Sequence, residues 1–277
     1  MPASNARAVE KARGLACDVV ILDLEDAVLP EAKPDAREAA VAAVRAGGFG
    51  RREVVVRVNA LSTPWGADDL AAVALAAPDA VLVPKVSSAA DVLAVHAALA
   101  GAPETTRLWV MIETCAAILA PREIAAAAKG TRLFGLVMGI NDLAKEMGAR
   151  MTPDRAPFHA ALSLSVIAAR AAGLAVLDGV HNEIDDLAAL EAVCRQGRDF
   201  GFDGKTLIHP SHLDICNRVF TPDADEVAWA RAVIAAFDAP ENAGKGALRV
   251  NGRLAERLHR DQAVELVAIA EAIEAAG

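Results

Sequence analysis

The chain has 277 residues, of which 54% are hydrophobic, 4% are aromatic and none is tyrosine; its formal net charge is −9 at pH 7. This composition excludes a disordered chain, which lacks apolar surface, and it argues against the broad basic surface that nucleic-acid binding requires. No uninterrupted apolar run approaches the roughly 18 residues of a membrane span.

The first predicted element is a helix, with Ser4 or Asn5 as N-cap and apolar residues at Val9, Ala12 and Leu15. We expect no signal peptide before it, and the four cysteines lie far apart without a C-x-x-C motif. We therefore expect reduced thiols in a cytoplasmic protein.

Seven short apolar segments then alternate with helical patterns. The apolar segments are residues 18–24, 53–59, 80–85, 108–113, 133–139, 174–180 and 202–209. The helical patterns between them cover residues 35–46, 67–76, 89–100, 116–128, 157–172 and 184–196. Continuous rather than alternating hydrophobicity is typical of strands that are buried on both faces of a parallel sheet. The β-α order predicts either a TIM (β/α)8 barrel or a doubly wound sheet.

Polar residues gather at the carboxyl ends of these segments, and this favours the barrel. Barrel enzymes place their active sites where all the carboxyl ends converge. A doubly wound sheet usually carries a glycine-rich first turn, and the sequence has neither G-x-G-x-x-G nor a P-loop. We therefore predict a catalytic barrel over residues 1–220, with the doubly wound sheet as the alternative.

The pattern changes after His209. A helix is predicted over residues 225–236, then a Gly/Pro-rich linker over 240–246, a short segment over 247–251 and an amphipathic helix over 253–276. We expect residues 221–277 to form a helical extension, too short for a core of its own, that packs on the barrel or on a neighbouring subunit.

Several charged residues at the predicted strand ends are candidates for chemistry. Glu113 and Asp142 end two successive predicted strands, and two such carboxylates can hold one Mg²⁺ together with waters and substrate oxygens. A salt-bridged pair without a metal is the alternative. Arg57 is suited either to clamp a substrate carboxylate or to pair with the acidic group Asp23, Glu25 and Asp26.

Lys85 follows Pro84 at the end of a predicted strand. A lysine there either forms a Schiff base or pairs with the acidic residues, and the ion pair is favoured because nothing in the sequence indicates a depressed pKa. No G-x-S-x-G motif supports a serine hydrolase.

Eight strings occur in order along nearly the whole chain: VILDLEDAV (20–28), RVN (57–59), TPWGADDL (63–70), VPK (83–85), MIET (111–114), GINDLA (139–144), LDGV (177–180) and GFDGKTLIHP (201–210). As an ordered set they resemble the citrate lyase beta-subunit-like CoA-ester lyases of the HpcH/HpaI aldolase superfamily. The resemblance implies a (β/α)8 barrel that assembles as a trimer or a dimer of trimers. It also implies Mg²⁺-dependent cleavage or formation of a carbon–carbon bond between an acyl-CoA and a 2-oxo acid, with malyl-, citramalyl- or citryl-CoA as substrate class.

The resemblance also implies roles for particular residues. Glu113 and Asp142 would be the metal ligands, with Glu113 also near the substrate, and Arg57 would bind the carboxylate of the oxo acid. Asp23, Glu25 and Asp26 would form an acidic shell tied to water ligands or to Lys85. Arg7 and Lys11, in the first helix, match the positions that meet the CoA phosphates.

Two departures from the family pattern stand out. Related lyases carry a C-terminal Asp, donated by the neighbouring subunit, as acid/base; Glu256 stands at that position here, which argues against a thioesterase or malate-synthase-like side activity. The family's first strand ends in Val-Pro-Gly/Ala-Ser, and residues 1–4 match only its last residues. We therefore expect about one strand to be lacking, with an interruption between the strands that begin near Asp18 and Phe202.

The leading prediction is a Mg²⁺-dependent CoA-ester lyase. One alternative is a CoA-independent 2-oxo-acid aldolase on the same barrel. Another is a carrier-dependent citrate lyase beta subunit that is inactive without its partner subunits. The sequence does not distinguish among the acyl groups, because one methylene changes discrimination by only about 1–3 kcal/mol.

Overall fold

The structure is a computed structural model that describes residues 1–276. The chain divides into two compact units, Met1–Cys216 and the remainder from Asn217 onward. The described residues contain no helix that is both long and apolar enough to cross a membrane. All four cysteines are free thiols.

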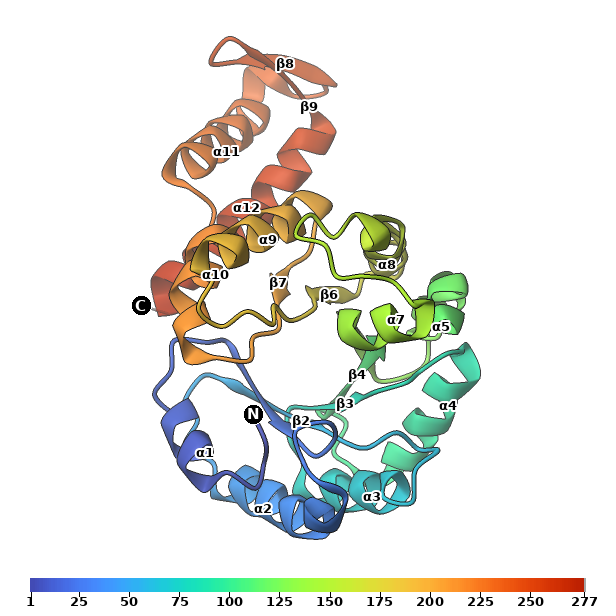
Figure 1. The fold of residues 1–277 in the computed structure, drawn as a ribbon. Coiled ribbons are helices and arrows are strands. Elements are labelled where there is room, and N and C mark those ends of the chain that lie inside the picture. Colours follow the sequence, from blue (N-terminus) through green and yellow to red (C-terminus); the bar gives the residue numbers. More distant parts are fainter. Residues whose placement is uncertain (277) are drawn as a thin grey trace. The chain divides into compact units, whose positions relative to one another are not determined.

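The first unit is built on one seven-stranded parallel sheet (Figure 1). Its strands are β1 (Val19–Asp23), β2 (Glu53–Arg57), β3 (Ala80–Val83), β4 (Arg107–Ile112), β5 (Leu133–Met138), β6 (Ala175–Asp178) and β7 (Gly204–Lys205). Each strand pairs with the next in the sequence, so the order is β1 to β7 without a reversal. A doubly wound sheet would reverse its strand order at a switch point, and that alternative is therefore wrong.

The helices of this unit lie between the strands in the sequence. They are α1 (Ala6–Ala12), α2 (Lys33–Ala46), α3 (Gly66–Ala76), α4 (Ala89–Ala98), α5 (Cys115–Leu119), α6 (Pro121–Ala126), α7 (Ile140–Met147), α8 (His159–Ala172), α9 (Leu187–Phe200) and α10 (Leu213–Phe220), the last of which continues past Cys216. Short 3-10 turns occur at Pro30–Ala32, Leu99–Gly101, Ala156–Phe158 and Pro210–His212. Figure 1 shows the sheet curling, with α2, α3 and α4 on its outer side.

The sheet is open between β1 and β7 in the described part of the chain, as the sequence predicted. Within residues 1–276, only residues 1–3 pair with the free edge of β1. The amide nitrogen of Ala3 donates to the Asp23 carbonyl oxygen at 3.0 Å, and the amide nitrogen of Asp23 donates to the Met1 carbonyl oxygen at 2.9 Å. The Met1 ammonium donates to the Ile21 carbonyl oxygen at 3.0 Å, so the chain start satisfies part of an otherwise unpaired strand edge.

Most of the predicted elements are present, and the differences have local causes. Asn5 caps α1 through its side chain, as one of the two expected residues. The single helix expected over residues 116–128 is two helices, because Pro121 lacks the amide hydrogen that would continue α5 and instead begins α6. Asp142, expected at a strand end, lies in the first turn of α7.

The second unit comprises α11 (Ala224–Asp238), the 3-10 turn Pro240–Asn242, a hairpin of β8 (Ala247–Val250) and β9 (Arg253–Glu256), and α12 (Arg257–Ala276). Residues 253–256 were expected to be helical, but they pair antiparallel with β8. The expectation that this segment lacks a core is also wrong. Val233, Phe237, Val250 and Ala255 are among the residues of a small buried cluster within it.

Candidate functional site

The alternation of side chains along the strands brings three of the candidate residues to one face of the sheet. The cluster of buried residues on that face includes Val55 on β2 together with Trp109 and Met111 on β4. Side chains two residues apart on a strand share a face, so the same series continues to Arg57 and Glu113 at the carboxyl ends. On β1, Ile21 packs against this cluster and the series continues to Asp23.

Arg57 and Asp23 form a two-pronged ion pair across neighbouring strands. They are Cα partners at the end of the β1–β2 register. Arg57 Nε donates to Asp23 Oδ1 and Nη2 donates to Asp23 Oδ2, both at 2.6 Å. Burial by itself raises the pKa of Asp23, but the charge and hydrogen bonds of Arg57, with two backbone amides, outweigh it and hold that pKa below its usual value.

The remaining nitrogen of the same guanidinium faces the other two acids of the predicted group. Arg57 Nη1 lies 2.9 Å from Glu25 Oε2 and 3.3 Å from Asp26 Oδ2. Burial is the largest influence on Glu25 and raises its pKa to about 8, despite the neighbouring Arg57. The structure thus places Arg57 with the acidic group Asp23, Glu25 and Asp26, which was one of the two expected arrangements.

Lys85 joins the two carboxylates that the sequence singled out as metal ligands. Its ammonium nitrogen lies 2.5 Å from Asp142 Oδ2 and 3.3 Å from Glu113 Oε1. Its backbone amide also donates to Glu113 Oε1, at 2.8 Å. Lys85 was expected to pair with the acids near Arg57, but its ion pairs are instead with Glu113 and Asp142.

The backbone at Lys85 explains this contact. Lys85 has φ of +58°, in the left-handed region that non-glycine residues seldom occupy. This turn directly after β3 points the amide of Lys85 across to the end of β4, where Glu113 lies. Strained backbone of this kind persists only where surrounding contacts enforce it, and such residues cluster at functional sites.

The charges of this cluster shift one another's pKa values. Glu113 is fully buried, and burial raises its pKa, although Lys85 opposes the shift. Burial lowers the pKa of Lys85, but the hydrogen bond to Asp142 and the charge of Glu113 outweigh it, so the net shift is upward. The ammonium of Lys85 is therefore charged at neutral pH.

The carboxylate oxygens of Glu113 and Asp142 are suitable ligands for a hard divalent cation such as Mg²⁺. That ion uses one or two protein carboxylates and takes its other oxygens from water or substrate. Glu113 Oε2 is buried and has no hydrogen-bond partner among the described residues, so its lone pairs are free. The described residues contain no cluster of three or more His, Cys, Asp or Glu arranged as metal ligands, so a site that needs three protein ligands does not fit.

Gly139 makes room for the Glu113 carboxylate, and the sequence reasoning missed it. A Cβ atom on residue 139 would overlap both Oε2 and Cβ of Glu113. The amide of Gly139 donates to the Ile112 carbonyl oxygen at 3.1 Å, which fixes the backbone there. The signal was available in principle, since Gly139 is the last residue of a predicted strand and precedes Asp142 by three residues.

A buried lysine, also missed from the sequence, supports the loop that carries Glu25. Lys33 Nζ donates to the carbonyl oxygens of Leu24 and Glu25, both at 3.0 Å, and to Asn59 Oδ1 at 2.7 Å. Asn59 Nδ2 in turn donates to Asp69 Oδ2 at 2.6 Å. These contacts join residues far apart in the sequence, so no local pattern could have indicated them.

Polar residues at the ends of the later strands form a separate cluster. Asp178 at the end of β6 is fully buried and lies 2.7 Å from Arg155 Nη1 and 3.1 Å from Lys205 Nζ. Two cations around one buried carboxylate satisfy that charge internally. Asp178 lies near the carboxyl end of a predicted strand, and its partners there are these two cations.

The residues expected to act on CoA or as acid/base are on other elements of the chain. Arg7 and Lys11 are both exposed on α1, four residues apart and so on the same side of the helix. Glu256 is the exposed last residue of β9 in the second unit, and its amide donates to His259 Nδ1 at 2.9 Å.

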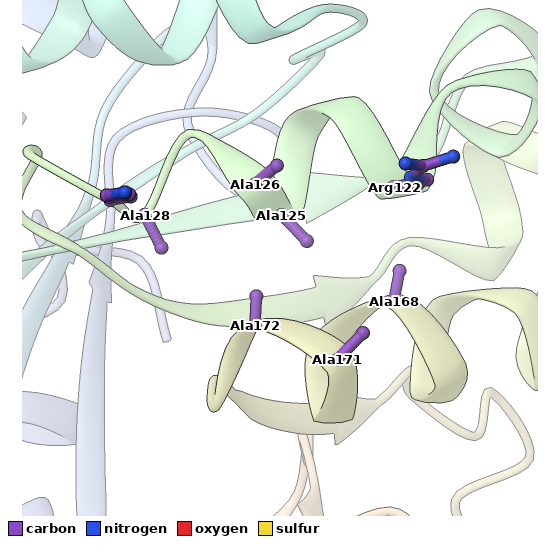
Figure 2. Close-up of a pocket in the computed structure, with 8 residues that line it drawn as sticks. Arg122, Ala125, Ala126, Ala128, Ala168, Ala171 and Ala172 are labelled. Carbon is purple, nitrogen blue, oxygen red and sulfur yellow. The ribbon is translucent and has the colours of Figure 1, made fainter.

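A groove on the outer side of the first unit is a different feature (Figure 2). It lies between α6 and α8 and is lined by Ala125, Ala126, Ala168 and other alanines, with Arg122 and Lys129. None of the described residues that line it is acidic or belongs to the ion-pair clusters above. We therefore place the candidate site at Glu113, Asp142, Lys85 and Arg57, and not in this groove.

Known proteins are similar to this chain over nearly its whole length. The family model described as HpcH/HpaI aldolase/citrate lyase matches residues 1–210. A (3S)-malyl-CoA thioesterase of Cereibacter sphaeroides is 49% identical over 275 residues, which cover 99% of this chain and 94% of the relative. An L-malyl-CoA/beta-methylmalyl-CoA lyase of the same species is 34% identical over 300 residues, with the same coverage of 99% and 94%.

A solved structure is similar over nearly the full length. The protein CitE from Mycobacterium tuberculosis, crystallised in complex with magnesium, acetoacetate and coenzyme A, is 32% identical and superimposes with a TM-score of 0.77. The match covers 98% of this chain and 96% of that chain.

Proposed function

The chain belongs to the HpcH/HpaI aldolase/citrate lyase family, and from that premise we propose that it is a Mg²⁺-dependent CoA-ester lyase. It would cleave or form the carbon–carbon bond between an acyl-CoA and a 2-oxo acid, with malyl-CoA esters as the favoured class. The observation that carries the proposal is the pair Glu113 and Asp142, held by one lysine at the ends of neighbouring β-α units.

Glu113 and Asp142 would hold the cation, and the free, buried Oε2 atom of Glu113 supports this assignment. When bound, the cation supplies Lewis-acid polarisation of the carbonyl and carboxylate of the oxo acid. The relative crystallised with magnesium, acetoacetate and coenzyme A supports the choice of ion.

Arg57 is proposed to bind the carboxylate of the oxo acid. Its Nε and Nη2 atoms are committed to Asp23, so the Nη1 side, next to Glu25 and Asp26, is the part that would face a substrate. A guanidinium fixed on two edges presents its remaining donors in a set direction, and this orients the bound acid before reaction.

In the cleavage direction, a base accepts the proton of the substrate hydroxyl group, and a new carbonyl forms as the carbon–carbon bond breaks. The electron pair of that bond passes to the thioester fragment as an enolate, which is then protonated at carbon. We assign the acid/base role to Glu256 of a neighbouring subunit in a homo-oligomer. Lys85 is assigned to pair with Glu113 and Asp142 while no cation is bound, and Asp23, Glu25 and Asp26 are assigned to hold Arg57.

The CoA moiety is proposed to lie along α1, where Arg7 and Lys11 would meet its phosphates. We further infer that the seven strands and residues 1–3 form an incomplete (β/α)8 barrel, in which residues 1–3 take the end of the eighth position. A homo-oligomer, a trimer or a hexamer, completes the proposal.

Hydrolysis of the thioester is a second candidate function. Its support is the 49% identity to malyl-CoA thioesterases over 99% of this chain, against 34% to the malyl-CoA lyase. The two reactions share a substrate but differ in the bond that is broken. Lysis releases glyoxylate and acetyl-CoA, whereas hydrolysis releases malate and CoA with a free thiol.

One assay separates the two reactions. The purified protein is incubated with (3S)-malyl-CoA and Mg²⁺, and glyoxylate, acetyl-CoA and free thiol are followed in parallel. Equal release of glyoxylate and acetyl-CoA supports the lyase, and thiol without glyoxylate supports the thioesterase. Glu113→Gln and Asp142→Asn are expected to abolish turnover and binding of the metal, whereas Glu38→Gln, on the exposed side of α2, is the control. Full activity in both site variants would refute the metal assignment.

A further inference from the structure

Lys85 makes its ion pairs with the same two side chains that the proposed function assigns to the cation. Its ammonium contacts Asp142 Oδ2 at 2.5 Å and Glu113 Oε1 at 3.3 Å. Each carboxylate therefore has one oxygen directed at a cation that belongs to the chain itself. A divalent ion bound to Glu113 and Asp142 would lie close to that ammonium, and their like charges repel strongly where burial reduces screening.

The backbone and the side chain of Lys85 contribute separately to this arrangement. The backbone amide binds Glu113 Oε1 at 2.8 Å and is fixed by the left-handed turn after β3. The side chain is 33% exposed, so its ammonium has a route to water. Movement of the ammonium away from the carboxylates would thus leave the Glu113 anchor in place.

We propose that Lys85 is a tethered competitor of the divalent cation: its ammonium pairs with Glu113 and Asp142, and binding of the cation displaces it toward solvent. The inference rests on the proposed function, because it takes Glu113 and Asp142 as the ligands. Its consequence is that Lys85 sets the metal affinity. The lysine keeps two neighbouring carboxylates from repelling each other and weakens binding of the ion that replaces it.

The first experiment measures binding of Mn²⁺, an ion that accepts the same oxygen ligands as Mg²⁺, by isothermal titration calorimetry. Lys85→Met removes the charge and keeps a side chain of similar length, so we expect binding at least about tenfold tighter than in the natural protein. In EDTA the same variant should melt at a lower temperature, because the two carboxylates lose their shared counter-ion. Lys85→Arg keeps a cation and should bind Mn²⁺ about as the natural protein does.

Lys129→Met is the matched control for net charge. Lys129 is exposed and lies just before β5, at the opposite end of that strand from Asp142. Its loss should leave Mn²⁺ affinity unchanged. Unchanged or weaker binding in Lys85→Met would overturn the proposal, and weaker binding would show that the ammonium instead positions the carboxylates for the metal.

A second experiment uses the natural sequence, so it does not depend on the folding of a variant. Lysine amines are acetylated with a limiting dose of acetic anhydride, with and without saturating Mn²⁺, and the extent at each lysine is read by peptide mass spectrometry. Displacement predicts that Mn²⁺ increases acetylation of Lys85 several-fold relative to Lys129. Equal or lower acetylation of Lys85 with the metal overturns the proposal.

A double variant distinguishes failure of this inference from failure of the proposed function. If Lys85→Met binds Mn²⁺ tightly, Lys85→Met combined with Glu113→Gln should lose that binding. Loss of this kind supports both the ligand assignment and the competition. If Mn²⁺ binding persists without Glu113, the proposed ligands are wrong, and the competition proposed for Lys85 is overturned as well. If binding requires Glu113 but its affinity is the same with and without the Lys85 ammonium, only the competition is refuted.

Discussion

Arg57 and Asp23 are the last partners in the register of β1 and β2, and two hydrogen bonds of 2.6 Å join their side chains. Asp23 and Arg57 are the last residues of their strands, and their side chains lie on the same face of the sheet. Arg57 is therefore part of the fold as well as a candidate for substrate binding. An uncharged residue in place of Arg57 leaves the side chain of Asp23, which is only 6% exposed, without its counter-ion.

Replacement of Arg57 by methionine should accordingly destabilise the protein. We expect a loss of about 3–5 kcal/mol in the free energy of unfolding, the usual cost of removing one partner of a buried ion pair. Urea denaturation at pH 7 measures it. The double variant Arg57→Met/Asp23→Asn removes the stranded charge and should recover a large part of the loss; a single-variant loss below about 1 kcal/mol would contradict the prediction.

The pH dependence of this pair has a definite sign. Arg57 holds the pKa of Asp23 below its usual value, so the carboxylate stabilises the folded state above the unfolded pKa. That stability is lost as the pH falls through the lowered folded value. The difference in stability between the natural protein and Asp23→Asn should therefore shrink progressively in acid.

Glu25 is expected to show the opposite dependence. Burial raises its pKa to about 8, from an ordinary value of 4.5. The folded state then binds a proton that the unfolded chain has released, so the protein loses stability as the pH rises between these two values. Glu25→Gln should flatten the melting temperature over this range, and it should melt above the natural protein at pH 9. Parallel pH profiles for the two proteins would show that Glu25 titrates normally.

The strand ends could be predicted from the sequence, and the contacts between them only in part. The uninterrupted apolar segments determined the parallel sheet, and the polar residues that follow them gave Asp23, Arg57, Lys85 and Glu113. The partners of Lys85 could not be predicted, because they depend on a left-handed turn at an ordinary lysine. Asp142 was found by its type and spacing, but its helix was missed because α7 is only eight residues long.

Residues that support the site without taking part in the chemistry were harder to predict from the sequence. Lys33 and Asn59 lie 26 positions apart and meet at 2.7 Å, and periodicity along one segment carries no information about such a contact. Gly139 is a similar case, because glycine is required there by the side chain of Glu113, which follows another strand. In each case the tertiary fold, and not the local sequence, defines the environment.

Gly139→Ala is a direct test of that requirement. The added methyl group would overlap the Glu113 carboxylate, which has to shift away from its position. We expect Mn²⁺ affinity to fall about 10- to 100-fold, the range found when residues that orient metal ligands are changed, although no ligand is removed. Gly101→Ala is the matched control, because a Cβ atom there meets no other atom within 4 Å. Equal affinities in the two variants would show that Glu113 does not bind the metal.

Charge reversal on α1 tests the CoA site and separates the two enzyme classes that the sequence left open. Arg7 and Lys11 are exposed and lie on one side of the helix, so Arg7→Glu/Lys11→Glu should fold normally. If these residues meet the CoA phosphates, the KM for malyl-CoA should rise about tenfold, the effect of losing two exposed charge pairs. Because salt screens exposed charges, high salt should reduce the difference in KM between the variant and the natural protein.

The control for this last test reverses two charges of similar exposure elsewhere. Arg122 and Lys129 are exposed residues that line the alanine groove on the outer side (Figure 2). Their reversal changes the net charge by the same amount and should leave the KM for malyl-CoA unchanged. A CoA-independent aldolase would instead show the same kinetics in both double variants, because its substrate carries no phosphates for α1 to bind. An increase in KM confined to the α1 variant therefore identifies the thioester, and not the oxo acid alone, as what the enzyme binds.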